Sequence, residues 1–420
     1  MRRIYLTIIL ALSSILSFSQ DIKYANYLID SLSAPAMHGR GYVFQSDLTA
    51  AKFIKSELEK NNVLSFNKNY FQYFELNTNT FPGNMKVLIN DNELIPGIDY
   101  LIASSSPTIK GDYKVEILDA KIIANKKKYR KFKQKKHSEN FILIDTIGLN
   151  NPKFKETYDK IKKHNILKAK GIITIQDKNL TYVPSPIVNN FPVVEIKRQS
   201  LPSKIKNINI DIKSEYLLNY KTQNIVGYIE GEIDSFIVFS AHYDHIGRMG
   251  KNTYFPGAND NASGVAMLLD LAKTLNSRNQ KPHYSIAFIF FSGEELGLLG
   301  SRYYTQNPVF ELDKIKVLLN LDMVGSGDKG ITIVNGKVFT SEFDKLKNIN
   351  DQQKYLPEVK SRGAAANSDH YFFYEKGVKS FFIYTRGEYK EYHNINDKYE
   401  NLPLNKFEEL EKLLLDFIEK

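Results

Sequence analysis

Histidine and acidic residues follow four of the apolar runs in the second half of the chain. Such runs are typical of strands that are buried on both faces of a parallel sheet, and the carboxyl ends of parallel strands meet at one edge. Several like charges gathered there would repel one another strongly unless cations neutralised them. The sequence therefore predicts a divalent-metal site that draws on these residues, in chain order: His242, Asp260, Glu294, Glu295, Asp322 and His393.

The residue types restrict the metal. The chain has no cysteine and only eight histidines, which excludes Cys-ligated zinc, iron-sulfur clusters, thiol nucleophiles and disulfides. Imidazole and carboxylate without sulfur suit catalytic zinc, and a bridging carboxylate suits a pair of ions about 3.5 Å apart. Each residue taken alone is an ordinary loop or capping residue, so the prediction rests on their conjunction.

The elements that must position these residues alternate between strand and helix from Asn224 onward. Nearly continuous apolar strands, linked by an amphipathic crossover helix, are typical of a parallel sheet covered by helices. The fold class predicted is therefore α/β, a three-layer sandwich with a mostly parallel mixed sheet. The expected strands are 236–240, 284–291, 315–321 and 379–385, the expected helix is 265–275, and the glycine-rich loop 257–264 opens that helix.

The first half of the chain has two further patterns. Residues 21–60 have helical periodicity that is broken at 34–41. Short apolar runs separated by lysine-rich connections then predict a small β-rich inserted domain. We expect a catalytic domain formed by 20–87 and 221–420 around an insert at 88–220, with insert strands at 141–144, 171–175 and 192–196.

The N-terminus predicts export. Arg2 and Arg3 precede the apolar residues 4–16 and the small-x-small pattern Ser17-Phe18-Ser19. This order is typical of a secretory signal peptide, here residues 1–19, and places the mature protein in the periplasm, at the cell surface or outside the cell. No later apolar run approaches 18 residues, so no stable membrane span is expected after cleavage.

The charge of the chain is concentrated in one run. The 57 basic and 47 acidic residues give a net charge of +10, and residues 126–136 contain eight of the basic ones. No nucleic-acid motif accompanies this run, so it is interpreted as a solvated helix face or loop, and no nucleic-acid partner is expected.

The motifs around the acidic residues resemble those of the two-zinc aminopeptidase family, which includes glutamate carboxypeptidase and, more distantly, glutaminyl cyclase. The resemblance runs from about Asn224 to the C-terminus. Met37–Gly41 is similar to the family's N-terminal break, and 141–196 resembles its protease-associated insert. The motifs are Ala241–Asp244, Gly257–Gly264, Phe290–Ser301, Asn320–Gly325 and Tyr392-His393.

The resemblance implies a two-zinc exopeptidase fold and a role for each residue. Glu294 is implied as the general base that takes a proton from the attacking water and passes it to the leaving amine. The ligands implied are His242 and Asp322 for one zinc, Glu295 and His393 for the other, and Asp260 between them.

Other residues are implied to support this set. Asp244 is placed to accept the second imidazole proton of His242. Asp397 serves His393 in the same way or caps the segment before Leu402. Tyr392 donates to the oxyanion or only packs. The family pattern does not use His245, Asp369 or His370 as ligands, and it predicts a strained or cis peptide at Asp260–Asn261.

The function expected is that of an exported zinc aminopeptidase acting on peptides. A carboxypeptidase stays open, with Arg362 or Arg386 as the clamp for a terminal carboxylate. A glutaminyl cyclase is disfavoured because the chain has no tryptophan to line such a pocket. A non-catalytic binding descendant is the remaining alternative, although no ligand is missing. Oligomeric state and preferred side chain stay open.

Overall fold

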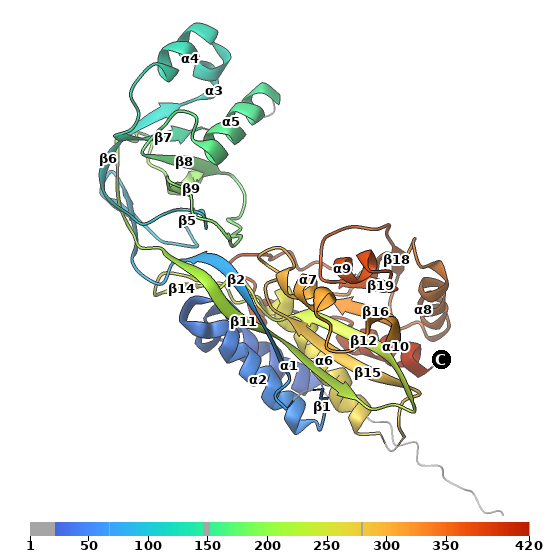
Figure 1. Cartoon of the computed structure of the whole chain (residues 1–420). Coiled ribbons are helices and arrows are strands. Elements are labelled where there is room, and N and C mark those ends of the chain that lie inside the picture. Colours follow the sequence, from blue (N-terminus) through green and yellow to red (C-terminus); the bar gives the residue numbers. More distant parts are fainter. Residues whose placement is uncertain (1–21, 67, 146–151, 279, 420) are drawn as a thin grey trace, which may run out of the picture.

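The computed structural model describes residues 22–66, 68–145, 152–278 and 280–419. The predicted signal peptide, 1–19, lies outside these residues. Two sheets build two lobes, joined by the long strands β2 (Phe71–Thr80) and β11 (Glu215–Ile229) (Figure 1). Within the described ranges, no helix combines the length and apolar character that a membrane crossing requires.

The larger sheet carries the predicted site. Its central strands β15, β12, β16 and β19 are parallel, and β11 and β17 pair antiparallel at either side. The four strands and the crossover helix predicted from the sequence are confirmed. The order is β1 (Leu64–Ser65), β11, β15 (Tyr284–Phe291), β12 (Ile233–His242), β16 (Ile315–Leu321), β19 (Ser380–Thr385), β17 (Ile331–Val334), β18 (Val359–Ser361), with β2 paired to β11.

Helices cover both faces of this sheet, which confirms the three-layer sandwich. Alternate residues of β12 show the division, because Ile237 and Phe239 belong to one core and Phe236 and Val238 to the other. The first core contains α1 (Ile22–Ser33), α2 (Ser46–Lys60), α6 (Ser263–Asn276), α8 (Thr340–Gln353) and α10 (Phe407–Glu419); the second contains α7 (Leu299–Gln306) and α9 (His370–Glu375).

The smaller sheet forms the predicted β-rich insert. A bridge between Pro96 and Tyr100 brings its two edges together, so the sheet is a nearly closed barrel. Its strand order is β4 (Asn92–Leu94), β3 (Met85–Ile89), β10 (Asn207–Ile212), β6 (Ile109–Leu118), β7 (Asn140–Ile144), β8 (Gly171–Gln176), β9 (Val193–Lys197), β5 (Tyr100–Ile102). The domain boundaries at 88 and 220 stay a prediction.

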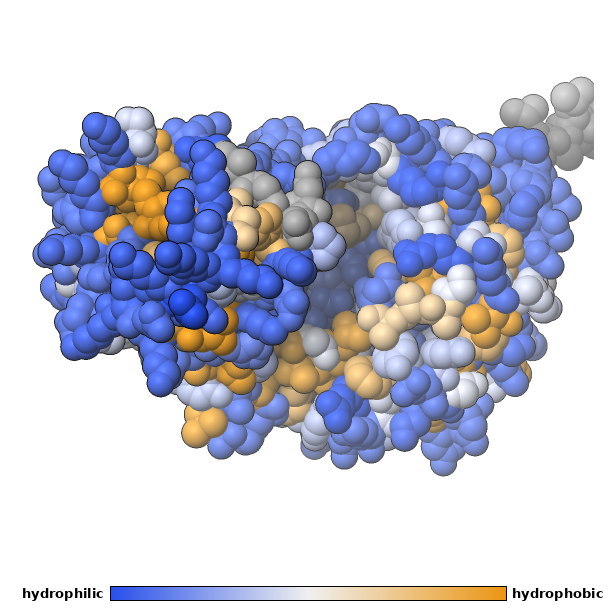
Figure 2. All heavy atoms as spheres, turned by 90° about the horizontal axis from the view of Figure 1, so that it is seen from above, coloured by the Kyte–Doolittle hydropathy of each residue, from blue (hydrophilic) through white to orange (hydrophobic). Residues whose placement is uncertain are grey.

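Three helices that the sequence analysis did not define cover the outer side of the insert: α3 (Ala120–Ala124), α4 (Lys126–Lys133) and α5 (Pro152–His164). The basic run forms α4, whose lysines are exposed while Phe132 is buried against the insert core. Figure 2 shows the mostly hydrophilic surface of this lobe and a hollow between it and the larger lobe.

Candidate metal centre

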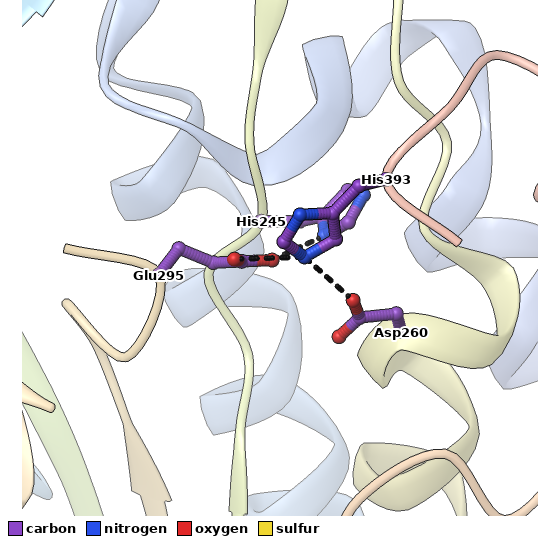
Figure 3. Close-up of side chains that lie close together, drawn as sticks. All are labelled: His245, Asp260, Glu295 and His393. Atoms are coloured by element: carbon purple, nitrogen blue, oxygen red, sulfur yellow. Dashed lines mark hydrogen bonds and ion pairs between the residues drawn. The ribbon is translucent and has the colours of Figure 1, made fainter. Parts of the chain in front are cut away.

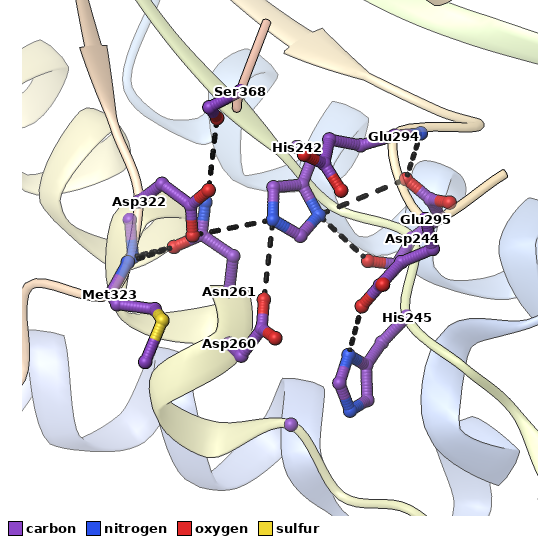
Figure 4. Close-up of polar contacts among 12 residues, drawn as sticks. His242, Asp244, His245, Asp260, Asn261, Glu294, Glu295, Asp322, Met323 and Ser368 are labelled. Carbon is purple, nitrogen blue, oxygen red and sulfur yellow. Dashed lines mark hydrogen bonds and ion pairs between the residues drawn. The ribbon is translucent and has the colours of Figure 1, made fainter. Parts of the chain in front are cut away.

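The fold brings the predicted ligands to one edge of the larger sheet. His242 is the last residue of β12, Asp322 directly follows β16, and Glu295 lies shortly after β15. These strands are parallel, so their carboxyl ends share an edge. Asp260 joins them from the turn before α6, and His393 from the segment after β19 (Figures 3 and 4).

Asp260 lies between two groups of potential ligands. Its Oδ1 is 3.3 Å from His242 Nε2, and its Oδ2 is 3.0 Å from His393 Nε2. His242 Nε2 is also 3.4 Å from Asp322 Oδ1, and His393 Nε2 is 3.0 Å from Glu295 Oε2. The grouping is therefore the one that the family resemblance implies. The peptide bond Asp260–Asn261 is cis, as predicted.

These distances suit a metal. Donor atoms about 2.0–2.1 Å from a tetrahedral zinc ion lie roughly 3.3 Å from one another. The side chains form two clusters, and within each cluster the donor atoms lie within 4.8 Å of one another. The first cluster is His245, Asp260, Glu295 and His393; the second is His242, Glu294 and Asp322.

The charges of the buried groups also favour a cation. Burial by itself would lower the pKa of His393, but Glu295 and Asp260 raise it to about 11. Burial likewise opposes protonation of His242, yet Asp322 and Glu294 hold its pKa well above the usual value. Asp322 Oδ1 has no hydrogen-bond donor among the described residues. Excess negative charge, imidazole and a buried carboxylate oxygen that accepts no hydrogen bond from the described residues together fit divalent metal ions.

Glu294 differs from its neighbour Glu295. Burial raises the pKa of Glu294, and the nearby Glu295 and Asp369 raise it further, to well above the usual value. Burial has the same effect on Glu295, but His393 and His245 outweigh it and lower its pKa to about 2. One carboxylate of the pair is thus suited to hold a cation and the other to carry a proton.

Asp244 has a different contact from the one predicted. His242 Nδ1 lies 3.1 Å from the backbone oxygen of Asp244, whereas the Asp244 carboxylate is 3.9 Å away. That carboxylate accepts hydrogen bonds from the Glu294 backbone N–H at 3.2 Å and from the Tyr42 hydroxyl at 3.1 Å. Asp244 therefore orients one ligand through its backbone and the general-base candidate through its side chain.

Asp397 supports Asp260, which neither predicted role anticipated. Its carboxylate accepts the backbone N–H of Asn259 at 2.9 Å and that of Asp260 at 3.1 Å, and the Tyr389 hydroxyl at 2.9 Å. His393 Nδ1, its expected partner, has no hydrogen bond within the described part of the chain. Asp397 therefore fixes the backbone that presents the shared carboxylate.

Three supporting residues were missed or set aside in the sequence analysis. His245 Nδ1 lies 2.8 Å from Glu295 Oε1, and the Ser368 hydroxyl donates to Asp322 Oδ2 at 2.9 Å. Arg40 is fully buried and donates to five backbone oxygens. The signal in the sequence was position: His245 and Ser368 stand beside recognised motifs, and Arg40 lies within the Met37–Gly41 break.

A cavity of about 350 Å³ opens onto the clusters, at the small end of ordinary ligand pockets. Tyr392 forms part of its wall and stacks on His393 with ring centres 3.8 Å apart. A larger hollow of about 790 Å³ lies near Met85 and Met249, separate from the clusters. The cavity lining comprises Thr181, Val183, Glu294, Glu295, Gly297, Leu298, Ala366, Asn367, Tyr392 and His393.

Parallel strands that end in two adjoining imidazole and carboxylate clusters define a candidate two-metal centre of the kind used in hydrolysis. Residues 224–418, which contain both clusters, match the sequence profile of peptidase family M28. This part of the chain belongs to that family.

Known proteins agree with this assignment. Aminopeptidase YwaD of Bacillus subtilis is 30% identical over 260 residues, which cover 58% of this chain and 55% of that protein. The probable leucine aminopeptidase 2 of Aspergillus oryzae is 30% identical over 190 residues, covering 43% of this chain and 36% of that protein. The chain thus spans about half, or less, of the length of these relatives.

Solved structures extend the similarity in fold to nearly the whole chain. The zinc aminopeptidase BSAP from Bacillus subtilis superposes with a TM-score of 0.70 at 22% identity and 94% coverage of each chain. The aminopeptidase from Aneurinibacillus sp. strain AM-1 gives a TM-score of 0.63 at 18% identity, covering 95% of this chain and 93% of that one.

Proposed function

We propose that the protein is an aminopeptidase that removes N-terminal residues from peptides and holds two zinc ions per chain. The observation that carries this proposal is Asp260, whose two oxygens face His242 and His393, with Glu294 beside them in the cavity wall. Zinc is chosen because the donors are imidazole and carboxylate and because a structural neighbour is described as a zinc aminopeptidase.

The charge of the cavity favours an N-terminal substrate. Among the described residues, its lining includes two carboxylates, Glu294 and Glu295, and neither lysine nor arginine. A carboxypeptidase needs a cationic side chain to bind the terminal carboxylate of its substrate, and no lysine or arginine of the described lining could do so. Of the clamps considered for a carboxypeptidase, Arg386 pairs with Glu358 at 2.8 Å, and Arg362 donates to the Tyr384 hydroxyl at 3.1 Å, both outside the lining.

The residues divide the work of hydrolysis. His242 and Asp322 would hold one ion, Glu295 and His393 the other, and Asp260 both. Bound divalent ions supply Lewis-acid chemistry, which lowers the pKa of water and polarises a carbonyl. Glu294, which lines the cavity beside the ligands, takes a proton from the attacking water and returns it to the leaving amine. The Tyr392 hydroxyl is proposed as a donor to the oxyanion.

The test is hydrolysis of matched unblocked and N-acetylated aminoacyl anilides and dipeptides, with chelator and with added zinc. We expect chelator-sensitive cleavage of the unblocked substrates alone. Cleavage confined to N-blocked peptides would replace the proposal with a carboxypeptidase. Absence of cleavage by protein with two bound ions would leave cyclisation of N-terminal glutamine or a binding role.

We also propose that the protein is exported. The support is the N-terminal order of Arg2 and Arg3, the apolar residues 4–16 and Ser17-Phe18-Ser19. N-terminal sequencing of protein recovered from its native cells should begin near Gln20. An intact Met1 would refute the proposal.

A further inference from the structure

One segment of the insert lies against the metal centre. Residues 177–192 connect β8 to β9 in the smaller sheet, yet Tyr182 reaches the larger lobe. Its backbone N–H donates to the backbone oxygen of His393 at 2.9 Å. Its ring is buried and stacks on Phe255, with centres 5.2 Å apart and planes 8° apart. The insert thus touches the backbone of a predicted metal ligand.

Further hydrogen bonds hold this segment against the strands that join the lobes. The Ser185 backbone oxygen accepts the Asn79 N–H at 2.9 Å, and the Pro186 oxygen accepts the Tyr216 hydroxyl at 3.0 Å. Asn79 and Tyr216 lie on β2 and β11, the two strands that join the lobes. The position of the segment over the cavity is therefore fixed by several contacts on different elements.

Because Tyr182 is buried, the residues before and after it face the cavity. Thr181 and Val183 are exposed on either side of the buried Tyr182, as alternate residues of an extended chain are. Both line the cavity that also contains Glu294 and His393. Val183 keeps 57% of its surface exposed, so its side chain is accessible from the cavity.

We propose that Val183 sets the size of the substrate side chain that the cavity accepts. This inference rests on the proposed aminopeptidase function. Val183, Leu298 and Ala366 give the cavity an apolar part, and the carboxylates give it an acidic part. An N-terminal residue with its amine near the carboxylates would place an apolar side chain against Val183. The substrates that fit best carry an unblocked N-terminus and an apolar side chain.

The test compares Val183→Phe and Val183→Ala with the wild type on unblocked alanine, leucine and phenylalanine anilides. Val183→Phe should lower kcat/KM for leucine and phenylalanine about tenfold or more relative to alanine, since a pocket discriminates by roughly 10-fold to 200-fold per methylene. Val183→Ala should shift preference toward phenylalanine. Ile187→Phe is the matched control, because Ile187 is 58% exposed on the same segment but lies outside the cavity lining.

The outcomes separate this inference from the function on which it rests. Unchanged preference ratios in both Val183 variants of an active enzyme would overturn the inference alone. An equal change in the Ile187 control would also overturn it, since the effect would then come from the whole segment. A wild type that cleaves none of the unblocked substrates would overturn the aminopeptidase proposal and this inference together.

Discussion

Replacing Arg40 should destabilise the larger lobe more than any surface substitution. The side chain is fully buried, and its guanidinium donates to the backbone oxygens of Leu32, Tyr243, Pro256, Gly257 and Asp260 at 2.7–3.2 Å. Burial lowers the pKa of Arg40 to about 10, so it remains charged at neutral pH. These bonds connect the helix α1, the turn after β12 and the loop that carries the shared carboxylate.

The magnitude follows from these contacts. A hydrogen bond from a charged donor contributes about 1.5–3 kcal/mol, so five would give roughly 7–15 kcal/mol if they were additive. Breaking a buried charged network by removing one partner costs about 3–5 kcal/mol in practice. We expect Arg40→Met to lower the free energy of unfolding by about 4 kcal/mol, which is roughly 8–16 °C in Tm.

The assay is urea and thermal unfolding followed by circular dichroism. Arg302→Met is the matched control, because Arg302 is exposed on α7 and its loss should change stability by less than about 0.5 kcal/mol. Arg40→Lys should recover only part of the loss, since an ammonium group cannot reproduce the planar set of donors. A loss below about 1 kcal/mol in Arg40→Met would refute the reasoning.

Three further predictions concern the metal centre and a buried acid. Glu294→Gln should lower kcat about 100-fold or more while the metal content per chain stays at the wild-type value; unchanged turnover would contradict its role as a base. Asp260→Ala should lower occupancy at both sites, measured by elemental analysis, and two ions retained per chain would refute its shared position. Burial and the nearby Asp270 raise the pKa of Glu411 from 4.5 to about 8. A raised folded-state pKa means that its stabilising contribution is complete below pH 4.5 and is lost as the pH rises through 8. Glu411→Gln should therefore raise the free energy of unfolding by roughly 2 kcal/mol at pH 9 relative to the wild type, and an equal change at pH 5 would contradict this linkage.

The parts that could be predicted from sequence depend on local pattern. The apolar runs before His242 and Asp322 defined β12 and β16, because strands buried on both faces contain few polar residues. The order of acidic and imidazole residues then placed them at a shared edge. The helices on the insert were not defined from the sequence because they are lysine-rich and bury little: α4 buries only Phe132 and α5 only Ile161.

The supporting contacts could not be predicted because their partners are distant in sequence. Arg40 bonds residues more than 200 positions away, and Asp397 bonds the Asp260 backbone 137 positions away. Asp244 shows a different limit. The spacing of two residues from His242 suggested a carboxylate-imidazole pair, but the Asp244 backbone oxygen reaches the ring, which frees the carboxylate for Glu294.

The same contacts explain how the fold keeps so many acids together. Burial raises the pKa of Asp244, Asp369 and Asp397 to about 7, so these three accept protons near neutral pH. The pKa of His393 is raised as well, to about 11, but by the neighbouring carboxylates and against the effect of burial, so the imidazole carries a positive charge. Without cations, protons on these aspartates and on His393 therefore offset the negative charge of the acidic groups at this centre. Two divalent ions would have to displace the imidazole protons, and metal affinity at this centre should rise with pH.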